Sequence, residues 1–170
     1  KKLYSSEVIY GVNTGFGKLS NVSISDQDQI LLQENLVRSH ASGIGKPFDL
    51  GLVRVILYLK ILTFIKGYSG IRLQVIQKII EYLNHDILPV IPQKGSVGAS
   101  GDLAPMGHMA LSLIGEGEVF FDGKRSKTSD ILNQLNIQPL KLEPKEGLSL
   151  INGTQVSTAI AIKTLLNGKV

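Results

Sequence analysis

One segment, residues 49–67, constrains the fold more than any other, because apolar residues occupy every side of the helix that it predicts. The predicted helix begins at Asp49, a residue type that caps helix N-termini, and ends at Gly67. Arg54 and Lys60 lie inside the apolar stretch, and such charges favour a buried helix over a membrane span. The segment therefore predicts a protein built around a deeply buried helix.

Helical patterns also cover most of the other segments. Residues 25–43 begin with Ser25 and Asp28, which together form an N-cap signal. An amphipathic pattern predicts a helix over residues 71–86, with five apolar residues at helical spacing: Leu73, Ile76, Ile79, Ile80 and Leu83. Further helices are predicted over residues 102–117, 126–136 and 156–168.

Extended structure is confined to two places. Pro89 and Pro92 disfavour a helix around them and predict an extended segment. Residues 118–125 predict a strand and a hairpin, whose turn is Asp122-Gly123. The expected fold class is mainly α, a helical domain with a small β-hairpin.

Composition excludes several functions. The chain of 170 residues is 43% hydrophobic with a net charge of +4, and no basic run or basic–aromatic pattern indicates nucleic-acid binding. It has no cysteine, and its three histidines are far apart, so we expect no metal site. The N-terminus lacks the apolar region of a signal peptide, which predicts a cytoplasmic protein without membrane contact. The missing initial Met and the ending in "LLNGKV" lead us to expect a fragment of a longer chain.

The small residues of "KGSVGASGDLAP" suggest chemistry by the backbone. Gly101 lacks a side chain, so its nitrogen can approach the carbonyl carbon of Ala99. Ring closure and two dehydrations would give an imidazolone whose exocyclic methylene comes from Ser100, a strong electrophile. A helix starting at Asp102 would aim N–H groups at this loop. For the Ala-Ser-Gly tripeptide alone, an ordinary loop entering a helix is by far the commoner case.

Three other segments carry candidate functional residues. "YGVNTGFGK" fails the spacing of a phosphate loop, but its glycines suit a mobile lid that carries Tyr10; a surface turn is the alternative. His40 lies near a helix C-terminus, where a histidine is commonly a cap. Residues 143–155 have loop character, and Asn152 could be the N-cap of the last helix.

Taken together and in order, these motifs resemble the aromatic amino acid ammonia-lyase family. They are "YGVNTGFG", "SHA", "GSVGASGDLAP" and "INGTQ", and the resemblance covers essentially all of the chain. It implies the N-terminal part of the helical, fumarase/aspartase-like fold of that family. It also implies that Ala99, Ser100 and Gly101 cyclise by themselves to the 4-methylidene-imidazol-5-one group (MIO), with Asp102 beside it and no metal.

The resemblance also implies roles for individual residues. Tyr10 corresponds to the base that removes the β-proton of the substrate, and Asn152 to the asparagine that contacts the substrate and the prosthetic group. Ser39 and His40 fall at the selectivity position, where this pair is similar to that of the members that act on L-histidine. The implied reaction releases ammonia and trans-urocanate from L-histidine, in histidine degradation.

Alternatives and departures accompany this interpretation. The alternatives are a tyrosine or phenylalanine lyase or an aminomutase of the same family, or a non-catalytic helical module. Lys60 and Leu62 stand where the family usually has Arg and Asn. Family members are much longer and tetrameric, with sites shared among subunits, so residues 1–170 resemble only their N-terminal region. We expect this piece alone to be inactive, because the loop needs its surroundings.

Overall fold

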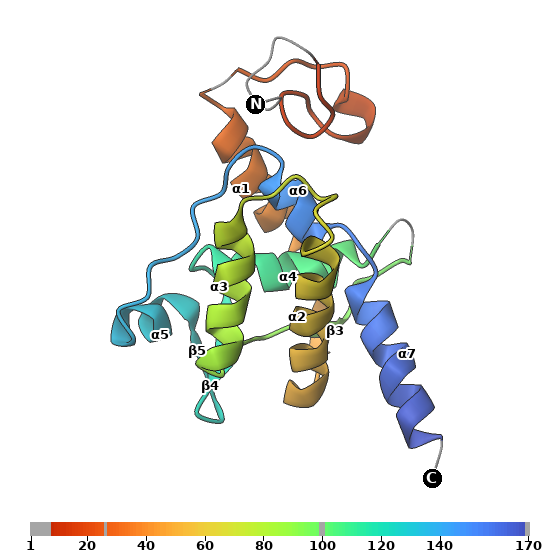
Figure 1. The fold of residues 1–170 in the computed structure, drawn as a ribbon, viewed down its shortest axis with the longest axis vertical. Coiled ribbons are helices and arrows are strands. Elements are labelled where there is room, and N and C mark those ends of the chain that lie inside the picture. The colour runs from red at the N-terminus through yellow and green to blue at the C-terminus, as the bar shows by residue number, and fades with distance from the viewer. Residues whose placement is uncertain (1–7, 26, 99–100, 169–170) are drawn as a thin grey trace.

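The structure is a computed structural model that describes residues 8–25, 27–98 and 101–168. It is mainly helical, with a two-stranded and a three-stranded sheet in the described part (Figure 1). This confirms the predicted fold class. In chain order the elements are η2 (Gly17–Leu19), α1 (Gln29–His40), β1 (Ile44–Pro47), α2 (Leu50–Phe64), α3 (Leu73–Asn84), β2 (Leu88–Pro89), β3 (Pro92–Lys94), α4 (Leu103–Leu113), β4 (Glu118–Phe121), β5 (Lys124–Lys127), α5 (Thr128–Gln134), α6 (Glu146–Ile151) and α7 (Gln155–Asn167).

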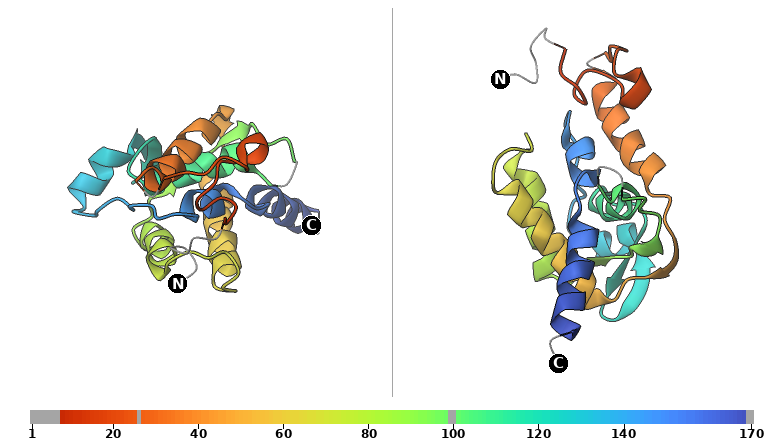
Figure 2. Two further views of the ribbon diagram at one scale, coloured as in Figure 1. Left: turned by 90° about the horizontal axis from the view of Figure 1, so that it is seen from above. Right: turned by 90° about the vertical axis from the view of Figure 1, so that its right-hand side faces the viewer.

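The helices pack around two central ones, α4 and α6. The α4 helix contacts α1, α6 and α7, and α2 contacts α3 and α7. The short helix α6 lies between α1 and α2 (Figure 2). Apolar side chains from all of these helices meet in one continuous core, whose fully buried members include Val37, Ile56, Leu57, Ile79, Met106, Met109 and Leu150.

Helix α2 begins as predicted, but it is buried on one side only. The Asp49 carboxylate accepts a hydrogen bond from the Leu52 N–H at 3.0 Å, which confirms the predicted N-cap. Tyr58 is 56% exposed and Leu62 is 36% exposed, so the expectation of burial all round is wrong. The unexpected feature is Lys60, a charged residue type that is only 1% exposed.

Two other details of the helix predictions are corrected. Helix α1 begins at Gln29, and the Ser25 hydroxyl donates to the Asp28 carboxylate at 2.6 Å instead of capping a helix. In α3 the predicted face is rotated, because Leu73 is 63% exposed while Tyr82 is fully buried. The Tyr82 hydroxyl donates to the Ser112 carbonyl at 2.6 Å, which allows this polar aromatic residue to lie in the core.

The sheets are small and antiparallel. Strands β4 and β5 form the predicted hairpin, and the positive φ angles of Asp122 (48°) and Gly123 (71°) match its tight turn. The predicted extended segment around Pro89 and Pro92 is confirmed. It contributes β2, which pairs with β4, and β3, which pairs with β1.

The prediction of a loop over residues 143–155 is wrong for Glu146–Ile151, which forms α6. A helix of six residues has little stability of its own, so it depends on packing against α1 and α4. Gly147 permits that packing, because a Cβ there would lie 2.6 Å from the Gln33 carbonyl oxygen. Asn152 is the C-cap of α6, and the residue before α7 is Thr154, so Asn152 is not the expected N-cap.

Candidate active site

The centre of the candidate site is the contact between Gly101 and the segment Asn152–Gly153. Gly101 has a φ of 134° and forms a bridge with Gly153, and the next N–H, from Asp102, donates to the Gly153 carbonyl at 2.8 Å. A Cβ on Gly101 would lie 2.9 Å from both N and O of Gly153 and 3.4 Å from the Asn152 Oδ1. Only glycine fits at position 101, and its lack of a side chain brings the Asn152 carboxamide against the loop. Ala99 and Ser100 lie outside the described residues.

The Asp102 carboxylate anchors the start of α4 to α7. It is fully buried and accepts hydrogen bonds from the Ser96 hydroxyl at 2.8 Å, the Ser157 N–H at 2.7 Å and the Ser157 hydroxyl at 2.6 Å. The Ser157 N–H belongs to the first turn of α7, where N–H groups lack partners within the helix. Asp102 therefore caps α7 from outside that helix and fixes it beside Gly101.

The Tyr10 loop is fastened to the fold at several points. Tyr10 is 49% exposed; its ring packs edge-on against Phe16, and its hydroxyl accepts a hydrogen bond from the Gly17 N–H at 3.3 Å. The Tyr10 carbonyl accepts from the Lys145 Nζ at 3.3 Å. The predicted lid tyrosine is thus linked through its backbone to Lys145, the residue that precedes α6.

Gln33, which sequence reasoning missed, joins this loop to α6. The side chain is fully buried on α1; its Nε2 donates to the Gly11 carbonyl at 3.1 Å, and its Oε1 accepts from the Leu148 N–H at 3.1 Å. An amide can donate and accept at once, which is what these two backbone groups require. The only sequence signal was a polar residue on a helix, which is too common to select Gln33.

Ser39 and His40 form the C-terminal end of α1. The Leu36 carbonyl accepts a hydrogen bond from the Ser39 hydroxyl at 2.9 Å and lies 2.8 Å from the His40 Nδ1. A carbonyl only accepts, so the Nδ1 carries a proton, and the Nε2 of the neutral ring is then an acceptor. The His40 backbone packs on α4, where a Cβ on Gly107 would lie 3.0 Å from the His40 carbonyl oxygen.

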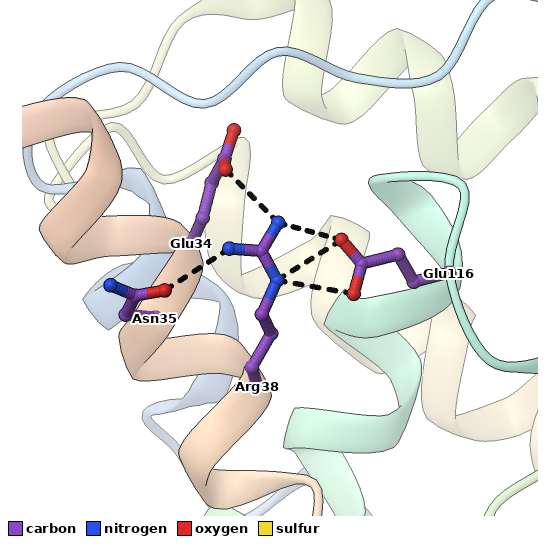
Figure 3. A network of polar contacts seen from close by, with 4 residues as sticks. All are labelled: Glu34, Asn35, Arg38 and Glu116. Carbon is purple, nitrogen blue, oxygen red and sulfur yellow. Dashed lines mark hydrogen bonds and ion pairs between the residues drawn. The ribbon is translucent and has the colours of Figure 1, made fainter.

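A surface ion-pair network holds the same end of α1. The Arg38 guanidinium bonds both carboxylate oxygens of Glu116, at 2.7 to 3.1 Å, and also contacts Glu34 and Asn35 (Figure 3). The hydrogen bond to Glu116 raises the pKa of Arg38. Because both side chains are exposed, the pair contributes below about 1 kcal/mol.

Asn152 also lines a cavity of about 330 Å³ between α2, α6 and the loop that follows α2. Its walls include two basic side chains, Lys60 and Lys145, together with Tyr68 and Ser69. Gly101, Asp102, Tyr10, Ser39 and His40 are not among the residues that line this cavity. Contacts with Gly153 bring Gly101 and Asp102 next to Asn152. Among the described residues, Tyr10, Ser39 and His40 form no hydrogen bond with these three.

Lys60 is the second residue that sequence reasoning missed as part of the site. Its Nζ donates to the carbonyls of Ser149 and Asn152, each at 2.7 Å, and lies 4.7 Å from the centroid of the Phe64 ring. Burial lowers the pKa of Lys60 to about 7. The signal in the sequence was a charge inside an apolar helix, shared with Arg54, but nothing there indicated that Lys60 lies on the buried side of the helix.

The described residues offer neither a metal centre nor a membrane span. Within these ranges, no three or more His, Cys, Asp or Glu side chains are grouped so that they could hold a metal ion. None of the described helices combines the length and apolarity needed to cross a membrane.

Comparison with known proteins gives the family. The family model described as aromatic amino acid lyase matches residues 1–169. Histidine ammonia-lyase of Bacillus velezensis is 52% identical over 163 residues, which are 96% of this chain and 32% of the relative. The chain thus spans about a third of the length of the curated relatives that it matches.

Solved structures agree with this assignment. Histidine ammonia-lyase from Trypanosoma cruzi matches with a TM-score of 0.86 and 37% identity, over 94% of this chain and 31% of that one. Tyrosine aminomutase from Streptomyces globisporus matches with a TM-score of 0.84 and 42% identity, over 91% of this chain and 29% of that one. The sequence motifs, the helical fold and these matches together show that the chain belongs to the aromatic amino acid lyase family.

Proposed function

We propose that the complete protein eliminates ammonia from L-histidine to give trans-urocanate, and that residues 1–170 are its N-terminal region. The observation that carries the proposal is the contact of Gly101 with Asn152 and Gly153. Relatives with about 50% sequence identity are named histidine ammonia-lyase, which supports L-histidine as the substrate. A cytoplasmic homotetramer with sites shared among subunits belongs to the same proposal.

The residues present fit the MIO group. Position 101 has a φ of 134° and no room for a Cβ, so the backbone of Gly101 stays bare where the ring would include it. Ala99 and Ser100, outside the described residues, are proposed as its other members, with Asp102 beside them. When formed, the group supplies an electrophile that makes the substrate amine a better leaving group.

The protein's own side chains bind and orient the substrate and remove its β-proton. We assign to Asn152 the hydrogen bonds that hold the substrate beside Gly101, because its Oδ1 lies next to that backbone. We assign to Tyr10 the removal of the β-proton. Its loop is attached to α6 through Lys145 and Gln33, so the position of Tyr10 and that of Asn152 are coupled through one short helix.

Selectivity for histidine is assigned to Ser39 and His40. The Nδ1–H of His40 is engaged by the Leu36 carbonyl, so the Nε2 can accept a hydrogen bond from an imidazole N–H of the substrate. Phenylalanine has no such donor on its ring. A site built to bond a substrate N–H discriminates strongly against analogues that lack it.

The test is turnover by the complete gene product of L-histidine, L-tyrosine and L-phenylalanine, with ammonia and the organic product both measured. We expect equal amounts of urocanate and ammonia from L-histidine, and little reaction of the other two. Preferential release of ammonia from L-tyrosine or L-phenylalanine would assign the protein to another lyase of the family. A β-amino acid formed without net ammonia would assign it to the aminomutases, and both outcomes contradict the proposal.

A further inference from the structure

The buried nitrogen of Lys60 joins two helices that approach the candidate site. Lys60 lies on α2, and both of its hydrogen bonds go to the C-terminal end of α6, to the carbonyls of Ser149 and Asn152. The last carbonyls of a helix have no partner within the helix, so they need donors from elsewhere. Lys60 supplies two such donors at 2.7 Å.

This contact is not an ion pair. None of the salt bridges formed by the described residues includes Lys60, and Glu146, the buried acid of α6, is paired with Arg72. A buried lysine without a carboxylate partner is costly, and an apolar side chain would fill the same space beside Phe64 at lower cost. What an apolar side chain lacks is the pair of N–H donors for Ser149 and Asn152.

The contact reaches the candidate site in two steps. Lys60 fixes the backbone carbonyl of Asn152, and the next residue, Gly153, forms the bridge with Gly101. On the opposite side of α6, the Gln33 amide holds the Leu148 N–H. In Figure 2, α1 and α2 lie on opposite sides of α6. One buried polar side chain from each of them, Gln33 on α1 and Lys60 on α2, is hydrogen-bonded to this short helix.

We propose that Lys60 is a positioning residue for the ammonia-lyase reaction, which holds the Asn152 carboxamide against Gly101 by fixing the end of α6. The inference rests on the proposed function. Its prediction is that loss of the two donors displaces Asn152 and lowers kcat, whereas a substitute that keeps N–H donors at this place preserves much of the rate.

The test compares Lys60→Met, Lys60→Gln and Lys60→Arg in the complete gene product, with Lys66→Met as the matched control on an exposed residue that follows α2. For each protein, kcat and KM for L-histidine are measured at a temperature where circular dichroism shows it folded. Each kcat is divided by the fraction of chains whose mass lacks two waters, so that only chains with a cyclised tripeptide are counted. We expect a fall in kcat of about 100-fold for Lys60→Met, a smaller fall for Gln and Arg, and no change for the control.

A double-mutant cycle separates positioning from general stability. If Lys60 acts through Asn152, Lys60→Met lowers kcat by a much smaller factor in an Asn152→Ala background than in the protein without other substitutions. An equal cost in both backgrounds overturns the inference, as does a Lys60→Met protein with unchanged kcat. If Lys60→Met does not fold, Lys60→Gln carries the same cycle. If the protein without any substitution does not consume L-histidine, that result instead contradicts the proposed function.

Discussion

The Asp102 carboxylate, at the N-terminal end of α4, accepts hydrogen bonds from both the backbone N–H and the hydroxyl of Ser157, in the first turn of α7. The Ser96 hydroxyl is its third donor. The Ser157 N–H can only donate, so the buried side chain at position 102 must present an acceptor to it, whereas the two hydroxyls can donate or accept. This single side chain connects the loop that contains Gly101 to the helix that follows Asn152.

Asp102→Ala should therefore destabilise the protein. Alanine offers no acceptor, and the buried Ser157 N–H left without a partner costs about 1–3 kcal/mol. Urea denaturation of the complete gene product measures the loss. Asp130→Ala, at an exposed residue of α5, is the control and should change stability by less than about 0.5 kcal/mol. Equal stability of the two variants would refute the role given to Asp102.

Gly101→Ala tests the close approach at the centre of the site. The added Cβ would lie 2.9 Å from the Gly153 backbone, so Gly153 and Asn152 must move, and we expect kcat to fall by about 100-fold. Gly123→Ala is the control, because Gly123 also has a positive φ (71°) but no atom within 4 Å of an added Cβ. It should cost about 1 kcal/mol of stability and leave kcat unchanged. A Gly101→Ala enzyme with normal kcat would exclude this contact from the site.

Gln33→Leu tests the connection between the Tyr10 loop and α6. Leucine cannot bond the Gly11 carbonyl or the Leu148 N–H, and we expect a loss of about 2 kcal/mol of stability and a fall in kcat of about tenfold. Gln74→Leu, on the exposed side of α3, is the matched control. The two measurements are urea denaturation and steady-state kinetics with L-histidine. A change in stability without any change in kcat would show that Gln33 does not position Tyr10.

His40→Leu tests the assigned selectivity. Removal of one neutral hydrogen bond should lower kcat/KM for L-histidine by about tenfold. His85→Leu, at an exposed residue after α3, should leave it unchanged. The replacement of Ser39 and His40 together by His and Leu should weaken histidine use in the same direction. Unchanged kcat/KM in the His40→Leu enzyme would remove His40 from the substrate contact.

The lowered pKa of Lys60 makes a prediction about stability and pH. The folded-state pKa is about 7 and the usual value is 10.5, so between these pH values the unfolded chain binds more protons. The contribution of Lys60 to stability therefore rises as the pH increases from 7 to 10.5, by on the order of 1 kcal/mol per pH unit. It is lost as the pH falls through about 7.

Lys60→Arg isolates this effect, because arginine stays protonated throughout and Lys145 and Tyr68, which line the same cavity, are present in both proteins. The unfolding midpoints of the two proteins are compared at several pH values from 7 to 10. The unchanged protein should gain stability relative to Lys60→Arg as the pH rises. A difference that does not vary with pH would show that Lys60 is not desolvated as described.

The sequence predicted local features well, because they depend on neighbouring residues. The Asp49 cap, the Asp122-Gly123 turn and most helix bounds follow from residue type and spacing. The predictions for α6 and for Asn152 as an N-cap failed for the opposite reason. Helix α6 is stabilised by α1 and α4, which are distant in sequence, and such packing overrides local preference.

The site was predictable as a set of motifs but not as an arrangement. The motif that contains Gly101 and the one that contains Asn152 were both identified, yet nothing in their spacing indicated that Gly101 and Gly153 pair. The roles of Lys60 and Gln33 could not be predicted from the sequence, because these roles depend on hydrogen bonds to backbone groups that are distant in the chain. A polar residue on a helix has the same sequence signature whether it points to solvent or to another helix.

We propose that residues 99–101 of this chain form the prosthetic group of an aromatic amino acid lyase. The intact mass of the complete gene product tests it most directly, with a Ser100→Ala variant as the reference. We expect a mass lower than the sequence requires by two water molecules, and no such loss in Ser100→Ala, which cannot form the exocyclic methylene. A full mass in the unchanged protein, with Ala99-Ser100-Gly101 intact, would contradict it.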